Sequence, residues 1–461
     1  MSKPPSVVMK KNQIDMTEGS IAARLIAFSV PLIISSILQL LFNAADIVVV
    51  GRFAGDNSLA AVGSTSSLIN MLVNLFTGLA TGTTVVAANY FGARDKANLH
   101  DTVHTSMVVS VFSGILLTII GIFGAKNILL MMGSPEEVLP LAQLYLKVYF
   151  AGITASMVYN FGSALLRAKG DTQRPLIILL IAGVINVVLN LIFVISFKMD
   201  VAGVALATVL SQVFASVVVV IILLHEKDDF HLCFRDLKIN RSVLSRIVRI
   251  GVPAGVQGIL FSFSNVIIQS SVNSFGSVVI AGNSAGSNIE GFVWTSMNGL
   301  SQGTMTFAGQ NLGAGKADRI KKLPLISQVL VTVEGLILGN IVVHFSAALL
   351  SIYTTNPDVI AQGVIRIKMV CTLYCLCGMM DCMANMIRGI GHSVLPMIVT
   401  IFGACGLRIL WIFTGFRYVE KFHNMTSLLA TYPVSWFVTW AVLVVCFIVI
   451  YKKEFPNARR N

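Results

Sequence analysis

One carboxylate interrupts an apolar stretch that is long enough to cross a bilayer as a helix. Residues 21–50 carry Pro31, Asn43 and, near their far end, Asp46. A charge at the middle of a membrane helix costs about 2.5–3.5 kcal/mol on insertion scales, so an acid there predicts a proton or cation site. Asp46 also lies only about five residues, or ~7 Å, from Gly51, which fits a side chain that reaches the membrane surface. Partners on other helices decide between these interpretations.

Amide and hydroxyl side chains of two later segments could be such partners. Asn186 and Asn190 are one turn apart and share a helix face, and Thr208 belongs to the next apolar segment. Counted from the ends of their segments, all three lie in the outer half to the midplane of the membrane, at the depth of Asp46. Such groups also join membrane helices by hydrogen bonds without binding an ion. The pattern therefore predicts either ligands of a cation or polar helix contacts.

The second half of the chain carries a different set of polar residues in apolar segments. Glu290 and Arg408 have a similar predicted depth, and an ion pair between them is the simplest way to bury both charges. A role in substrate binding or ion coupling is the alternative. The further residues predicted to line a substrate cavity or a second polar site are Asn43, Gln257, Asn265 and Asp381.

The composition indicates that these residues sit on membrane-spanning helices. The chain has 461 residues, of which 55% are hydrophobic and 12% charged, and its mean hydropathy is +0.81. These values predict an all-α polytopic membrane protein with about twelve transmembrane helices. The predicted spans are 21–50, 59–89, 103–123, 139–166, 176–197, 203–224, 244–272, 278–308, 325–350, 359–387, 396–414 and 429–450.

The formal net charge of +12 follows the predicted topology. Basic residues gather in alternate loops, on the same side as both termini; examples are Arg94, Arg167, Lys227, Arg319 and Arg388. The positive-inside rule then places both ends in the cytoplasm of a protein in the cell membrane. The basic excess is explained by orientation, so we expect no nucleic-acid partner.

A repeat divides the chain into two halves. Gly78, Gly82 and Gly92 recur as Gly299, Gly303 and Gly313 at an offset of 221 residues, and further matches join Arg167, Gly170 and Pro175 to Arg388, Gly391 and Pro396. The repeat predicts two six-helix lobes related by a parallel pseudo-twofold axis, the arrangement in which substrate lies between rocking lobes. The predicted parts are an N-terminal arm (1–20), an N-lobe (21–224), a cytoplasmic linker (225–242), a C-lobe (243–451) and a tail (452–461).

For two smaller features the sequence predicts no function. Residues 126–138 are too short to span and form either an interfacial segment or the end of the third helix. Of the seven cysteines, six lie in apolar segments and Cys233 lies in the linker, without a metal-ligand pattern, so we expect packing thiols.

Five short motifs follow one another along the chain: Val30-Pro31, the Asp-Ile-Val-Val-Val-Gly of 46–51, the Ala-x-Ala-Thr of 205–208, the Gln-Asn-Leu-Gly-Ala of 310–314 and the Arg-Gly-x-Gly of 388–391. Each is weak alone, but together and in this order they are specific. Through them the chain resembles the multidrug and toxic compound extrusion (MATE) family, in its prokaryotic branch, over nearly its whole length.

The resemblance implies a secondary antiporter that exports cationic or amphipathic drugs in exchange for protons or sodium ions. By the same resemblance, Asp46, Asn186, Asn190 and Thr208 form the coupling site, and sodium at Asp46 is the one metal ion implied. The family carries a second acid where this chain has Asn190, so a single carboxylate remains, which suits one proton or one sodium ion. No acid occurs within 253–268, so a second-lobe sodium site of the kind that some branches have is not expected; Asp381 could replace their acid on the tenth helix.

Other functions fit the sequence less well. A flippase for a lipid-linked glycan of the same superfamily would need cations deep in the membrane, and apart from Arg408 few are predicted there. A membrane enzyme would need a nucleophile or metal motif, and the chain has no His-Glu-x-x-His, Gly-x-Ser-x-Gly or P-loop. A passive channel remains an alternative. We expect no enzyme activity, no cofactor and no obligatory protein partner; the expected partners are a drug-like molecule and the bilayer.

Overall fold

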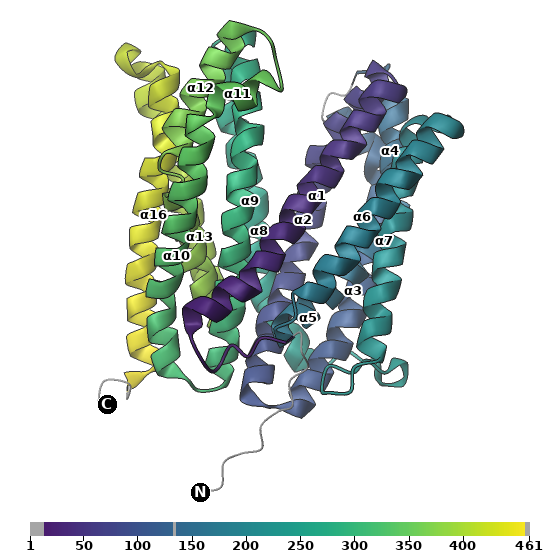
Figure 1. Cartoon of the computed structure of the whole chain (residues 1–461), viewed down its shortest axis with the longest axis vertical. Coiled ribbons are helices and arrows are strands. Elements are labelled where there is room, and N and C mark those ends of the chain that lie inside the picture. The colour runs from purple at the N-terminus through teal and green to yellow at the C-terminus, as the bar shows by residue number, and fades with distance from the viewer. Residues whose placement is uncertain (1–12, 132–134, 457–461) are drawn as a thin grey trace, which may run out of the picture.

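The computed structural model describes residues 13–131 and 135–456. Helices, and no strands, form this part of the chain. They make two lobes that lie close together at the end where the termini lie and diverge toward the opposite end (Figure 1). We call α1 to α7 the N-lobe and α8 to α16 the C-lobe.

The N-lobe contains seven α-helices and one π-helical turn. Their bounds are α1 (Ile21–Phe53), α2 (Asp56–Ala93), α3 (Lys96–Met131), α4 (Leu139–Ala151), α5 (Ile153–Lys169), α6 (Gln173–Leu191), η1 (Ile192–Ser196) and α7 (Asp200–Leu224). A short 3-10 turn, η2 (Phe234–Asp236), lies in the connection to the C-lobe.

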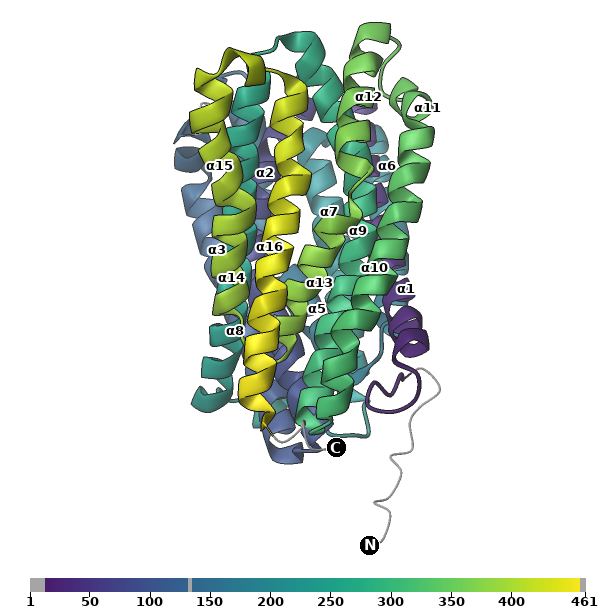
Figure 2. The ribbon, with the colours of Figure 1, turned by 90° about the vertical axis from the view of Figure 1, so that its left-hand side faces the viewer.

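The C-lobe repeats this plan with more interruptions (Figure 2). Its elements are α8 (Arg241–Asn273), α9 (Ser277–Gly313), α10 (Ala317–His344), α11 (Ser346–Ser351), α12 (Pro357–Cys371), α13 (Cys375–Gly389), α14 (Val394–Thr400), η3 (Ile401–Gly406), α15 (Leu407–Trp411), η4 (Ile412–Phe416), η5 (Glu420–Phe422) and α16 (Met425–Glu454).

The helices agree with the prediction of about twelve spans in two lobes. Among the described residues, nine spans are long and apolar enough to cross a membrane, and two more are the pairs α4 with α5 and α12 with α13, bent by 47° and 46°. The remaining long helix is α9, 37 residues that include many Ser, Asn and Gly. Of the two alternatives for residues 126–138, the structure favours the end of the third helix, because α3 continues to Met131; residues 132–134 lie outside the described part.

The repeated glycines form the contact between the lobes. A Cβ at Gly92 of α2 would collide with the carbonyl oxygen of Gln310 in α9, and one at Gly313 of α9 would collide with that of Asn89 in α2. Gln310 is the repeat partner of Asn89 at the offset of 221, so the two contacts are related by the pseudo-twofold axis. Both glycines are needed because the two backbones touch here.

The other repeated pair extends this interface. Gly78 and Gly82 of α2 pack on the backbone of α8 at Gly251, and Gly299 and Gly303 of α9 pack on α1. Small residues allow this close approach of membrane helices. The repeat seen in the sequence therefore marks the surface on which the lobes meet.

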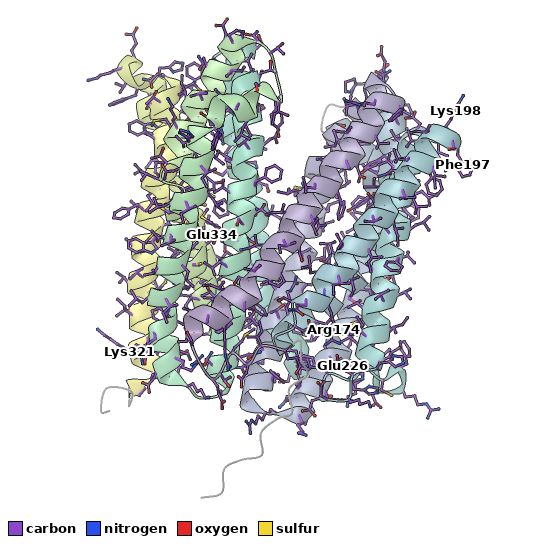
Figure 3. The ribbon with its side chains drawn as sticks, in the orientation of Figure 1. Arg174, Phe197, Lys198, Glu226, Lys321 and Glu334 are labelled. Atoms are coloured by element: carbon purple, nitrogen blue, oxygen red, sulfur yellow. The ribbon has the colours of Figure 1, made fainter. Side chains whose placement is uncertain are left out.

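Buried charges fix the linker to the N-lobe near the chain termini, where Figure 3 shows Arg174 and Glu226 side by side. Lys169 Nζ and Arg174 Nη1 donate to the Glu226 carboxylate over 2.6 and 2.5 Å. Burial opposes ionisation of Glu226, but these two hydrogen bonds outweigh burial and lower its pKa to about 2. The linker is therefore held by an ionised carboxylate.

This network predicts a pH-dependent stability. The stabilisation is present above the usual Glu pKa of 4.5 and is lost as the pH falls toward about 2. We expect Glu226→Gln to lower the apparent melting temperature by about 5 °C at neutral pH, and the difference from wild type to shrink below about pH 4.5. Thermal unfolding of detergent-purified protein measures this. The control is Asp229→Asn, which removes an exposed partner of Lys96. If the melting-temperature difference between wild type and Glu226→Gln stayed the same in acid, the ionised state of Glu226 would be contradicted.

The N-terminal arm bridges the lobes at the same end. Met16 is fully buried, and its carbonyl oxygen accepts hydrogen bonds from Asn311 Nδ2 and Arg319 Nη2 of the C-lobe, over 3.1 and 2.9 Å. The Ile14 amide donates to the Gly170 carbonyl of the N-lobe over 3.2 Å. The arm therefore adds to the glycine contacts that hold the lobes together at this end.

Candidate functional site

The structure brings together the four residues of the predicted coupling site. Asn190 Nδ2 of α6 donates to Asp46 Oδ1 of α1 and, over 3.3 Å, to Asn186 Oδ1. Asn186 Nδ2 donates to Thr208 Oγ1 of α7 over 3.2 Å, and that hydroxyl donates to the Val204 carbonyl over 3.0 Å. One chain of hydrogen bonds therefore joins the single carboxylate to both neighbouring helices.

A close approach of α1 and α6 makes this chain possible. Gly183 of α6 faces the ring of Phe42 in α1, where any Cβ would collide with the ring. Phe42 is about one turn before Asp46, and Gly183 about one turn before Asn186. The absence of a side chain at Gly183 thus sets the distance that the Asp46 carboxylate needs to reach α6.

Two tyrosines near the carboxylate were not predicted. Tyr145 and Tyr149 of α4 both interact electrostatically with Asp46, and their rings stack at 6.2 Å. Their spacing of four residues places both on one face of a helix, which was the available signal.

The oxygen atoms of the site fit a small cation. Asn190 is fully buried, and its Oδ1 has no hydrogen-bond partner among the described residues. An unpaired buried acceptor is costly unless a donor or a cation satisfies it. With the Asp46 carboxylate, Asn186 Oδ1 and Thr208 Oγ1, this oxygen offers the hard ligands that sodium prefers, and a protonated carboxyl is the other species that the set accommodates.

A cavity of about 580 Å³, the size of a drug-binding site, lies mainly in the C-lobe and is completed by α2 of the N-lobe; we call it the C-lobe cavity. Its walls come from α2, α8, α9, α12, α13, α15 and α16. The lining includes the aromatic rings of Trp294, Tyr374, Tyr432 and Trp436, and polar groups such as that of Asn298. The cavity is therefore amphipathic, with flat apolar surfaces and a few directed polar groups.

The predicted ion pair between Glu290 and Arg408 is wrong. Glu290 instead binds Arg366 of α12 in a bidentate pair, with Arg366 Nη2 to Glu290 Oε1 at 2.5 Å and Nε to Oε2 at 3.2 Å. Arg366 Nη1 also donates to Asn283 Oδ1 over 2.7 Å. Equal depth did not imply contact, because α12 packs directly on α9 whereas Arg408 lies on α15. Arg366 was missed although it stands inside the predicted span 359–387.

Arg388 is also placed differently from the prediction. We counted it among loop cations, but it is only 7% exposed at the end of α13 and lines the cavity. Its Nη2 donates to Gln257 Oε1 over 2.8 Å, and its Nη1 donates to Asn385. The cavity therefore contains three arginines where the sequence suggested one.

The remaining candidates divide between the cavity and its surroundings. Asp381 accepts a 3.2 Å hydrogen bond from Trp294 Nε1, and Asn265 lies in the cavity wall. Asn43 is exposed on α1, outside the residues that line the C-lobe cavity. A further acid of the C-lobe, Glu334 of α10, lies at mid-height in Figure 3 and accepts a hydrogen bond from Ser296 Oγ over 2.5 Å.

One cluster outside both sites has the composition of a metal centre. The ligand atoms of His100, His104 and Asp236 lie within 4.8 Å of one another. His104 already uses both ring nitrogens, since Nδ1 bonds the His100 carbonyl at 2.7 Å and Nε2 accepts from the Cys233 amide at 3.0 Å. These hydrogen bonds attach the linker to α3, so the cluster is explained by a structural role and not by metal binding.

Two helical lobes with a repeated topology, the Asp46 group in one and an amphipathic cavity mainly in the other, define a polytopic membrane transporter. The family model MatE matches residues 31–192 and 253–414, once in each half. The chain therefore belongs to the MatE (MATE) family, whose members are transporters and not enzymes.

The similarity to known proteins extends over nearly the full length of this chain. The chain is 25% identical to the probable multidrug resistance protein YoeA of Bacillus subtilis over 460 residues, 98% of both chains. It is 24% identical to the probable multidrug resistance protein NorM of Thermotoga maritima, over 89% of both. An outward-facing structure of a multidrug resistance MATE transporter superposes with a TM-score of 0.86 over 98% of this chain and 99% of that one, at 22% identity, which shows the shared fold.

Proposed function

We propose that this protein is a secondary active antiporter that exports cationic or amphipathic drug-like compounds in exchange for protons or sodium ions. The Asp46 group binds the coupling ion, and the C-lobe cavity binds the substrate. The protein lies in the cell membrane with its N-terminal arm, linker and tail in the cytoplasm. In this orientation the diverging ends of the lobes face outward.

The observation that carries the proposal is the separation of the two sites. The Asp46 carboxylate with its neighbouring unpaired amide oxygen lies in the N-lobe, and the drug-sized cavity lies mainly in the C-lobe, with Asp46 outside its lining. α1 holds Asp46 and also packs against α9, which lines the cavity. Ion binding at Asp46 can therefore bias the arrangement of the lobes, as antiport requires.

Transport by purified protein in proteoliposomes tests the proposal. Ethidium is the probe, and a pH gradient or a sodium gradient is imposed separately. We expect dye movement against its own gradient with one of the two ions and none without an ion gradient. Dye movement at a rate that depends on neither the pH gradient nor the sodium gradient would contradict antiport.

The flippase alternative gains one observation, the three cavity arginines, which suit an anionic group better than a cation. It predicts that the protein moves a lipid-linked pyrophosphate glycan between leaflets. Absence of ethidium transport together with leaflet exchange of that lipid would favour it. Antiport remains our proposal because it explains the Asp46 group as an ion site, whereas a flippase that works without an ion leaves that group unexplained.

A further inference from the structure

We infer that the C-lobe cavity contains a subsite for an anionic group, built on Arg408, and that its preferred ligands are aromatic compounds with a carboxylate or a phosphate. The inference rests on the proposed function, since it names the substrate class of the same cavity. Within the proposed function, this subsite selects amphipathic compounds that carry an anionic group, and a simple aromatic cation is bound by the rest of the cavity and not by Arg408.

Arg408 is buried without a counter-ion. Its side chain is 2% exposed, and its Nε donates to Ser435 Oγ over 2.8 Å. Nη2 is buried and has no hydrogen-bond partner in the described part of the chain, where no carboxylate forms an ion pair with Arg408 either. A guanidinium has five N–H donors, so most of its hydrogen-bonding capacity is unused.

The neighbouring acids are engaged elsewhere. Glu290 is neutralised by Arg366 through the bidentate pair, and Asp381 accepts a hydrogen bond from Trp294 and has Arg388 as its charged neighbour. In the described part of the chain, the hydrogen-bond acceptors of Arg388 are neutral side chains, among them Gln257. The lining side chains, three arginines against Glu290 and Asp381, leave one formal positive charge in excess.

Aromatic rings orient Arg408 and form one wall of the cavity. The guanidinium carbon lies 4.2 Å from the ring centre of Tyr432 and 5.4 Å from that of Trp436. Trp436 meets Tyr374 edge to face, with centres 5.2 Å apart. These cation–π contacts hold the guanidinium but supply no hydrogen-bond acceptor for Nη2.

The ligand chemistry follows from these three observations. A carboxylate or phosphate accepts parallel hydrogen bonds from a guanidinium, and a planar ring packs against the aromatic wall. Carboxylate and phosphate share this chemistry. The two π-helical segments on either side of α15, η3 and η4, place Arg408 in the kind of local distortion common at functional sites.

Equilibrium binding to purified protein in detergent tests the subsite without any gradient. Two matched pairs are used: flavin mononucleotide against riboflavin for phosphate, and a coumarin carboxylate against its carboxamide for carboxylate. We expect wild type to bind the charged member of at least one pair about tenfold more tightly than the neutral one. Arg408→Gln should abolish this preference without weakening the neutral ligand, and Arg408→Lys should retain part of it.

The control is Arg417→Gln, an exposed arginine beyond the cavity, which should keep the wild-type preference. The inference would be overturned if wild type bound the charged and the neutral member equally in both pairs. A preference for the charged member that survives in Arg408→Gln would also overturn it. A second readout needs no change at Arg408: the charged ligands should quench tryptophan fluorescence in wild type, and Trp436→Phe should remove most of that quenching. Undiminished quenching in Trp436→Phe would mean that the charged ligands do not bind beside Trp436.

The outcome is independent of the coupling proposal. Asp46→Asn should keep the preference for charged ligands, because Asp46 is not among the residues that line the cavity. A failure of antiport therefore shows in transport and leaves this binding result intact.

Discussion

We expect Asp46→Asn to lower gradient-driven transport about a hundredfold while the protein stays folded and binds its substrate. The amide keeps the size of the side chain and can still accept a hydrogen bond from Asn190. It cannot take up a proton or balance the charge of sodium, so ion binding no longer favours one arrangement of the lobes. Transport in proteoliposomes measures the loss, and substrate binding in detergent measures what remains.

Two further variants make this result specific. Glu334→Gln makes the same chemical change at a C-lobe acid that bonds Ser296, and it should leave coupling near the wild-type level. The double variant Asp46→Asn/Asn190→Asp exchanges the carboxylate and the amide that share one hydrogen bond. We expect it to restore part of the transport that Asp46→Asn alone loses. Transport by Asp46→Asn at the wild-type rate would remove Asp46 from the coupling site.

Hydropathy and the repeat predicted the fold but not its breaks. Each bent pair of helices reads in the sequence as one apolar segment, because apolar composition does not change at a bend. The bend between α4 and α5 lies at Gly152, where a Cβ would collide with Val209 of α7. That contact joins segments far apart in the sequence, so no local pattern could have shown it.

The candidate sites show the same limit. Asn186 and Asn190 could be paired from their spacing, because one turn fixes both depth and direction. For Glu290 and Arg408 only the depth could be estimated. Which helix lies beside α9 is decided by packing around the lobe, and there the neighbour is α12 with Arg366. Depth without direction cannot identify a partner.

The glycine contacts connect the proposed coupling site to the rest of the molecule. α1 carries Asp46 toward its C-terminal end and packs against Gly299 and Gly303 of α9 nearer its start. α9 in turn carries Glu290 and Trp294 into the cavity. A change in how α1 sits against α6 therefore acts directly on the helix that forms the cavity wall.

We expect Gly92→Ala and Gly313→Ala to reduce transport about tenfold or more, and by similar amounts. Either Cβ meets a carbonyl oxygen of the facing helix, so α2 and α9 must separate where the lobes now touch. Overpacking of this kind costs about 1–3 kcal/mol, which is enough to shift a balance between two lobe arrangements by one or two orders of magnitude. Transport in proteoliposomes measures the effect.

The matched control is Gly63→Ala in α2, because a Cβ there has no atom within 4 Å and should leave transport unchanged. Similar losses at Gly92 and Gly313 would follow from the pseudo-twofold axis, which makes each glycine the repeat partner of the other. Size-exclusion profiles and melting temperatures separate a shifted lobe arrangement from misfolding. A loss at Gly92 alone, or normal transport by both variants, would mean that the lobes do not depend on this contact during the transport cycle.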